Sequence, residues 1–128
     1  MEFCKVNDIL ITAYSPLGSR GIDKLLKESG SDIQVPDLME NPVVNEIATR
    51  LGKSPAQILL RYSIERGVSA IPKSTNAGRL KDNISIFDFE LLAEDKEKLL
   101  KLHAGIRLCN FKNFSFFKGI ETHNEFPF

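Results

Sequence analysis

One stretch of this chain carries the side chains that a phosphate ester needs. The run from Ile71 to Asn83 contains two cations, Lys73 and Arg79, among small hydroxyl and amide groups. Lysine and arginine form short, charge-assisted hydrogen bonds with phosphate oxygens. A helix is predicted to start within this run, and its first free N–H groups and its dipole also favour an anion. The residue types and their spacing therefore indicate a phosphate site.

A second stretch, AYSPLGS at residues 13–19, also ends a predicted strand with polar groups. It follows a nearly continuous apolar run and combines an aromatic ring, hydroxyl groups and a turn. Two such strand ends in one small chain predict half of a dinucleotide site. No G-x-G-x-x-G pattern is present, so the fingerprint of a Rossmann fold is absent.

The elements that position these stretches follow from apolar patterning and helix-capping residues. Strands are predicted at residues 8–14 and 68–71. Between them, Asn41-Pro42 and a capping box at residues 54–57 begin two helices, which are expected to end near Gly52 and Gly67. Further helices are predicted from about residue 76 and over residues 93–103. This order is that of a parallel βαβ unit, so the predicted class is α/β.

The predicted core comes from the apolar faces of these helices. The residues expected to be buried are Val43, Val44, Ile47, Ala48 and Leu51, then Ile58, Leu59 and Tyr62, and finally Leu92, Leu99, Leu100 and Leu102.

Composition bounds the possible functions. The chain has 128 residues, which fits one domain, and its 17 basic and 17 acidic residues give a formal net charge of zero. The chain has no excess of basic residues, which would favour nucleic-acid binding. It also has no basic amphipathic helix and no long apolar run, which would favour a membrane. Cys4 and Cys109 have no metal-ligand spacing, so we expect no metal site and a reducing, cytoplasmic location.

The tail after residue 103 is rich in phenylalanine but has little periodicity. Six of the nine phenylalanines lie between Phe111 and Phe128. Aromatic residues without a helical or strand pattern are typical of a loop that lines an apolar pocket. A tail that simply covers the core is an equally good interpretation.

With both strand ends described, the sequence resembles the aldo-keto reductases, the NADPH-dependent carbonyl reductases built on a (β/α)8 barrel. The resemblance rests on residues 13–19, on the run from Ile71 through Arg79 to Asn83, on residues 86–91 (IFDFEL) and on residues 107–109. It covers nearly the whole chain but only the last part of that barrel. It implies an incomplete barrel with two parallel strands and crossover helices, in which residues 104–128 form the C-terminal loop on the substrate side.

The resemblance also implies roles for individual residues. Tyr14 would stack on the nicotinamide, and Ser15, Leu17 (through its N–H) and Ser19 would meet the pyrophosphate. Lys73, Ser74 and Arg79 would hold the 2′-phosphate of NADP(H), with Thr75 and Asn76 at the helix start. Asp82 and Asn83 would reach the adenine amine, and Cys109 and Phe111 would form part of the wall of the pocket for a small carbonyl substrate.

The catalytic Tyr, Lys, Asp and His of the family belong to the earlier part of the barrel. Tyr62, His103 and His123 do not stand in matching motifs, so no catalytic residue is predicted here. We therefore expect a fragment of an NADPH-dependent reductase that is inactive alone. The alternatives are a non-catalytic module that binds NADP or a protein partner, and a remnant without activity.

Overall fold

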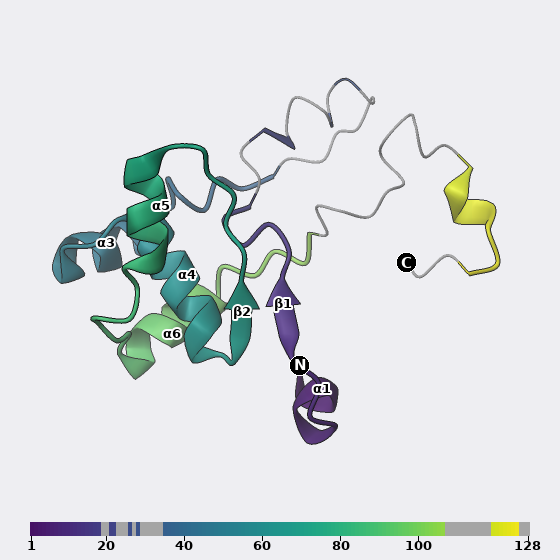
Figure 1. Cartoon of the computed structure of the whole chain (residues 1–128), viewed down its shortest axis with the longest axis horizontal. Helices are drawn as coiled ribbons and strands as arrows, with labels where there is room; N and C mark the ends of the chain where they lie inside the picture. Colours follow the sequence, from purple (N-terminus) through teal and green to yellow (C-terminus); the bar gives the residue numbers. More distant parts are fainter. Residues whose placement is uncertain (19–20, 23–25, 27, 29–34, 107–118, 126–128) are drawn as a thin grey trace. The chain divides into compact units, whose positions relative to one another are not determined.

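The structure is a computed structural model that describes residues 1–18, 21–22, 26, 28, 35–106 and 119–125. The chain divides into two compact units. The larger unit comprises Met1–Gly18 and Asp37–His103, and the smaller comprises Ser19–Pro36 and Ala104–Phe128. Both predicted phosphate-binding stretches, apart from Ser19, lie in the larger unit (Figure 1).

The sheet of the larger unit contains two parallel strands. β1 (Ile11–Ala13) pairs with β2 (Val68–Ala70), and the register places Ile11 opposite Val68 and Ala13 opposite Ala70. The predicted parallel pair with intervening helices is thus confirmed. Both strands are shorter than predicted, because only three residue pairs are in register.

Capping residues set the limits of the two helices that connect the strands. α3 (Pro42–Leu51) begins at Asn41, whose side-chain oxygen accepts a hydrogen bond from the Val43 N–H at 3.0 Å, and it ends at Gly52 in the left-handed conformation. α4 (Pro55–Glu65) begins with the predicted capping box of Ser54 and Gln57. These local signals can be identified in the sequence because each one involves groups only two or three residues apart.

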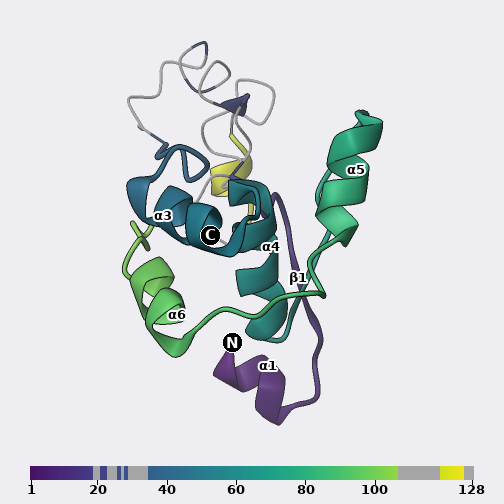
Figure 2. The ribbon, with the colours of Figure 1, turned by 90° about the vertical axis from the view of Figure 1, so that its left-hand side faces the viewer.

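Three further helices complete the larger unit: α1 (Glu2–Val6), α5 (Ala77–Ile84) and α6 (Ala93–Leu100). α4 packs on β2, α3 and α5, while α3 also packs on α6 (Figure 2). The core therefore lies among α3, α4 and α6. Its buried members are Val44, Ile47, Ala48, Ile58, Leu59, Leu91 and Leu99.

Several burial predictions need correction. Leu92 and Leu100 are 51% and 57% exposed, because Leu92 precedes the first turn of α6 and Leu99 is the residue that enters the core. Leu60 on α4 was not predicted to be buried but is fully enclosed, as is the carboxylate of Asp95. Arg50 neutralises Asp95 through an ion pair, and the two residues are 45 positions apart in the sequence.

The smaller unit contributes fewer described residues. Ile22 and Leu26 are buried, and η2 (Ile120–Thr122) forms one 3-10 turn after Gly119. Across the described parts of both units, no helix combines the length and apolar character needed to cross a membrane.

Candidate coenzyme-binding site

The sheet register brings the two phosphate-binding stretches to one edge. Because Ala13 lies opposite Ala70 in a parallel pair, Tyr14 and Ile71 leave the sheet side by side at its carboxyl end. The carboxyl end of parallel strands is where α/β proteins place their ligand sites. The loop after β1 and the loop after β2 therefore start from neighbouring points (Figure 1).

The loop after β1 presents an aromatic ring above a tight turn. The Tyr14 side chain is exposed, as a ring that is to stack on a ligand must be. The Ser15 carbonyl accepts a hydrogen bond from the Gly18 N–H at 2.9 Å, and both residues have positive φ angles. Leu17 packs against the core cluster, which anchors the turn to the larger unit.

The loop after β2 ends in a capped helix. Asn76 is the N-cap of α5, and its side-chain oxygen accepts a hydrogen bond from the Arg79 N–H at 3.0 Å. The Asn76 N–H in turn donates to the Ser74 hydroxyl at 3.2 Å. The structure thus connects Ser74, Asn76 and Arg79 through local hydrogen bonds at the start of α5.

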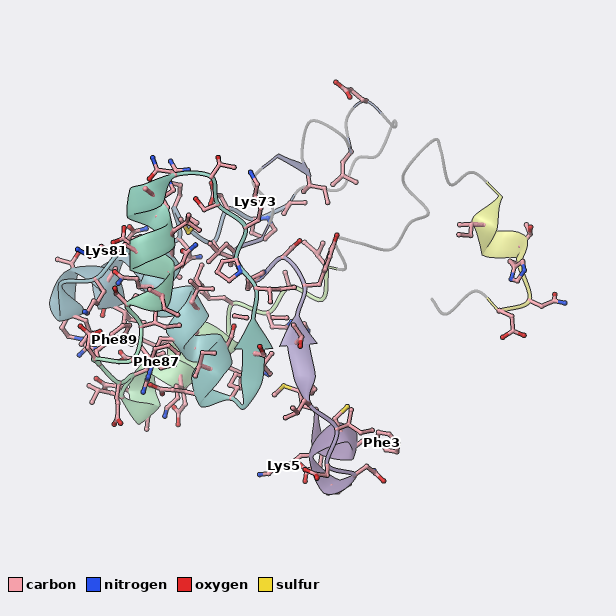
Figure 3. All side chains as sticks on the ribbon, viewed as in Figure 1. Phe3, Lys5, Lys73, Lys81, Phe87 and Phe89 are labelled. Atoms are coloured by element: carbon pink, nitrogen blue, oxygen red, sulfur yellow. The ribbon has the colours of Figure 1, made fainter. Side chains whose placement is uncertain are left out.

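The charges of this loop are available to a ligand. Lys73, Thr75, Arg79 and Asp82 are exposed, and Asn83 is half-buried. Within the described part of the chain, neither Lys73 nor Arg79 forms an ion pair with a carboxylate. Figure 3 labels Lys73 in the loop that follows β2. Two cations without carboxylate partners beside a helix start fit the charge of a phosphate group.

Three predicted site residues cannot be placed. Ser19, Cys109 and Phe111 lie outside the described residues, so their roles stay predictions. Among the residues that the structure describes, no group of His, Cys, Asp and Glu could hold a metal ion.

The sequence did not reveal the hydrogen bonds by which α4 holds the two residues that follow α5. Gln57 donates to the Ser85 carbonyl at 2.7 Å, and Arg61 donates to the Ile86 carbonyl at 3.0 Å. We call Gln57 and Arg61, with these two bonds, the α4 clamp. Capping-box logic predicted only that Gln57 would face its own helix start, because its partner Ser85 is 28 residues away.

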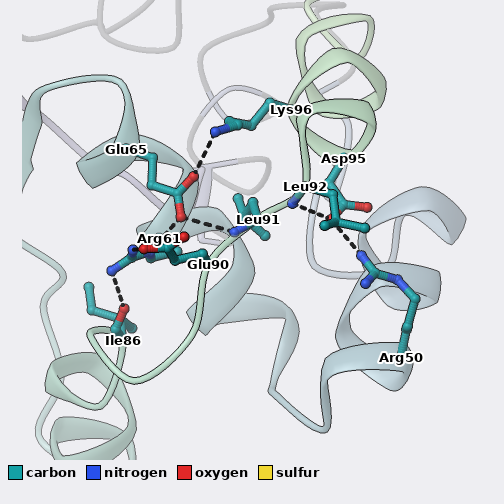
Figure 4. A network of polar contacts seen from close by, with 9 residues as sticks. All are labelled: Arg50, Arg61, Glu65, Ile86, Glu90, Leu91, Leu92, Asp95 and Lys96. Atoms are coloured by element: carbon teal, nitrogen blue, oxygen red, sulfur yellow. Dashed lines mark hydrogen bonds and ion pairs between the residues drawn. The ribbon is translucent and has the colours of Figure 1, made fainter.

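Glu65, one turn beyond Arg61, extends these contacts to α6 (Figure 4). Its carboxylate accepts hydrogen bonds from the Leu91 N–H at 3.0 Å and from the Arg61 guanidinium at 2.6 Å, and it pairs with Lys96 at 3.2 Å. Burial alone would raise the pKa of Glu65. The bonds from Leu91, Arg61 and Lys96 outweigh burial and hold the pKa below its ordinary value.

Comparison with known proteins agrees with this geometry. The sequence pattern of the Aldo/keto reductase family matches residues 1–104, and the chain belongs to that family, which has a TIM-barrel fold. The resemblance inferred from residues 13–19 and 71–83 is thereby confirmed. The open two-stranded sheet is consistent with part of such a barrel.

Individual relatives align with all or most of this chain. Prostaglandin F synthase 1 of Bos taurus is 38% identical over 128 residues, which are 100% of this chain and 36% of the relative. The NADH-dependent D-xylose reductase of Candida parapsilosis is 38% identical over 116 residues, 90% of this chain and 35% of the relative. The chain therefore spans just over a third of the length of these relatives.

A solved structure gives the same result. The crystal structure of an aldo/keto reductase from Brucella melitensis matches with a TM-score of 0.63 and 37% identity, over 80% of this chain and 33% of that one.

Proposed function

We propose that this chain supplies the coenzyme-binding part of a reductase that uses NADPH to convert an aldehyde or ketone to an alcohol. One observation carries the proposal: the parallel register places the Tyr14 loop and the Lys73 loop at one end of the sheet. The aldo-keto reductase relatives support the reaction class. The two neighbouring loops offer both an aromatic surface and unneutralised cations, the two features that a phosphorylated dinucleotide needs.

Each loop has a separate task in this proposal. Bound NADPH would supply the hydride that reduces the carbonyl group. Tyr14 would support the nicotinamide end with its exposed ring, and Ser15 and Leu17 would meet the pyrophosphate. Lys73, Ser74 and Arg79 would bind the 2′-phosphate, with Thr75 and Asn76 at the start of α5. Asp82 and Asn83, in its last turns, would reach the adenine.

The choice of NADPH over NADH rests on charge. The 2′-phosphate adds a doubly charged group that Arg79 can bind with two parallel hydrogen bonds and that Lys73 can neutralise. NADH has no group for these bonds. The D-xylose reductase of Candida parapsilosis is named as an NADH-dependent enzyme, so membership of the family does not by itself fix the coenzyme. The preference is therefore tested directly.

The test replaces both cations, in the variant Lys73→Met/Arg79→Leu. Two charge-assisted hydrogen bonds sum to roughly 3–6 kcal/mol, and the loss should be at the lower end of that range, because both side chains are exposed and solvent screens them. NADH binding should change far less. Fluorescence titration of wild type and variant with NADPH and NADH measures both affinities.

A matched control removes two positive charges elsewhere. Lys81 lies on α5 (Figure 3) but faces another side than Arg79, because the two residues are only two positions apart. Lys101 follows α6. Lys81→Met/Lys101→Leu should leave the NADPH to NADH preference unchanged. Equal losses for both coenzymes in the Lys73/Arg79 variant would mean that the 2′-phosphate assignment is wrong.

The second candidate function is a module that binds NADP without catalysis. Its support is the prediction from the sequence that Tyr62, His103 and His123 do not stand in the family's catalytic motifs. A chimaera separates the two candidates: residues 1–128 replace the aligned segment of bovine prostaglandin F synthase 1, which they match along their whole length. The reductase proposal expects NADPH oxidation with a generic aldehyde. A folded chimaera that binds NADPH but reduces no aldehyde favours the binding module.

A further inference from the structure

α5 carries three predicted coenzyme residues, yet no residue of this helix is buried. Its apolar side chains Leu80 and Ile84 are 49% and 66% exposed. Burial of apolar surface normally fixes a helix on its domain, and here that contribution is small. The position of α5, and with it the position of Arg79 and Asn83, therefore depends on how the two ends of the helix are held.

The two ends are held differently. The N-terminal end follows directly from β2 and is capped by its own residue Asn76. The C-terminal end is held from outside by the α4 clamp: Gln57 binds the carbonyl of Ser85, the residue after α5, and Arg61 binds the next carbonyl. Both clamp side chains are largely enclosed, at 7% exposure for Gln57 and 12% for the Arg61 side chain. A hydrogen bond in such surroundings is costly to break.

We propose that Gln57 is a positioning residue for the coenzyme. Through the Ser85 carbonyl it holds the end of α5, so that the helix presents Arg79 and Asn83 to the adenosine phosphate. The inference rests on the function proposed above and extends it to a residue that contacts no coenzyme group. Gln57 is suited to this task because its amide oxygen accepts from the Ser54 N–H at 2.9 Å, which orients its NH₂ group toward Ser85.

The two bonds of the Gln57 side chain can be separated by one substitution. In Gln57→Glu the carboxylate still accepts from the Ser54 N–H, as glutamate does in other capping boxes. An ionised carboxylate cannot donate to the Ser85 carbonyl, so the tie to α5 is lost. Burial and the nearby Ser85 carbonyl both favour a protonated carboxyl group, which could still donate. Gln57→Met, which has no donor at any pH, is therefore measured beside Gln57→Glu.

Ser54→Ala is the matched control. It removes the hydroxyl that accepts from the Gln57 backbone N–H at 3.3 Å and leaves the Ser85 bond in place. Ser54→Ala and Gln57→Glu should both lower the stability of the chain, because each changes the capping box at the start of α4. Only Gln57→Glu should disturb α5. Gln57→Met is a second variant that introduces no charge and serves if a buried carboxylate prevents folding.

The first readout is coenzyme preference. In the full 128-residue chain, Gln57→Glu should weaken NADPH binding about tenfold relative to NADH, the size of effect expected when one charge-assisted bond to the 2′-phosphate is misaligned. Ser54→Ala should leave this ratio unchanged although it also destabilises α4. A purely structural role of Gln57 predicts the same ratio in wild type and both variants, and that result would overturn the proposal.

The second readout needs no coenzyme. Hydrogen exchange at the amides of residues 81–85 should become faster in Gln57→Glu and in Gln57→Met, but not in Ser54→Ala. Unchanged exchange in α5 would reject the positioning role even if NADPH binding were altered. If the wild-type chain shows no preference for NADPH over NADH, the proposed function is rejected. Faster hydrogen exchange in the Gln57 variants would in that case still show that Gln57 holds α5.

Discussion

At the scale of single residues, the loop after β1 holds an unusual backbone. Ser15 has a φ angle of 53° although it precedes Pro16, whose ring normally forces the preceding residue into an extended conformation. Gly18 at φ 81° closes the same turn. Two left-handed residues within four positions cost free energy unless the surroundings require them, and such residues gather at ligand sites. Their place directly after Tyr14 supports the site proposed there.

Gly18→Ala tests how much the turn depends on this backbone. A methyl group at Gly18 would meet no atom within 4 Å, so the only cost is the left-handed backbone. The free energy of unfolding should fall by about 1–2 kcal/mol, measured by chemical denaturation. Gly21, which also has open space but lacks a left-handed φ, is the control. A loss of similar size in Gly21→Ala would show that the effect does not come from the Gly18 backbone.

At the scale of elements, Glu65 connects α4 to the segment before α6 and to α6 itself. The three contacts that lower its pKa are made only in the folded chain. A carboxyl group with a lowered folded pKa contributes stability above its unfolded pKa, about 4.3, and loses it as the pH falls through the folded value. The link between α4 and α6 should therefore weaken in acid.

Glu65→Gln should remove this acid dependence. At pH 7 the variant should lose about 1.5–3 kcal/mol of unfolding free energy, the range for hydrogen bonds to a charged group, and the difference from wild type should shrink as the pH falls below about 4.3. Chemical denaturation of both proteins at a series of pH values measures this difference in unfolding free energy. Glu97→Gln on the exposed side of α6 should show neither effect. A difference between Glu65→Gln and wild type that stays constant at all pH values would show that ionisation of Glu65 does not cause the acid dependence.

How far the sequence predicted these elements depends on the distance between interacting groups. The starts of α3 and α4 could be predicted, because Asn41 and Ser54 bond to groups two and three residues away. The two candidate loops could also be identified from their residue types. The length of β1 could not, because strand pairing with β2 decides it. The capping role of Gln57 could be predicted, but its bond to Ser85 and the ion pair of Asp95 with Arg50 could not, because these partners lie 28 and 45 residues away.

At the scale of the whole molecule, apolar side chains on α1 and just before β1 are exposed on the larger unit. Phe3, Val6 and Leu10 are 71%, 70% and 91% exposed. In the described part of the chain β1 pairs with β2 alone, which leaves its other edge unpaired. An apolar surface beside an open strand edge favours association with other chains.

Phe3→Lys/Leu10→Lys tests this surface. The variant should bind less of the dye ANS and should sediment as smaller species than wild type, because two charges interrupt the apolar surface. Its unfolding free energy should stay within about 0.5 kcal/mol of wild type, since neither side chain is buried. Leu92→Lys/Leu100→Lys places the same charges at the two ends of α6 as a control. Equal reduction of self-association by both variants would argue against a special role of β1.

The pairing of Ile11 with Val68 also bears on the order in which the chain folds. Contacts within α3 and α4 are local, so we expect them to form early, whereas β1 can pair only after both helices and β2 have formed. We therefore expect the edge that joins the two loops to be among the last parts to assemble. A dinucleotide that bridges them would act on this final step and would slow the reopening of the chain more than it speeds folding.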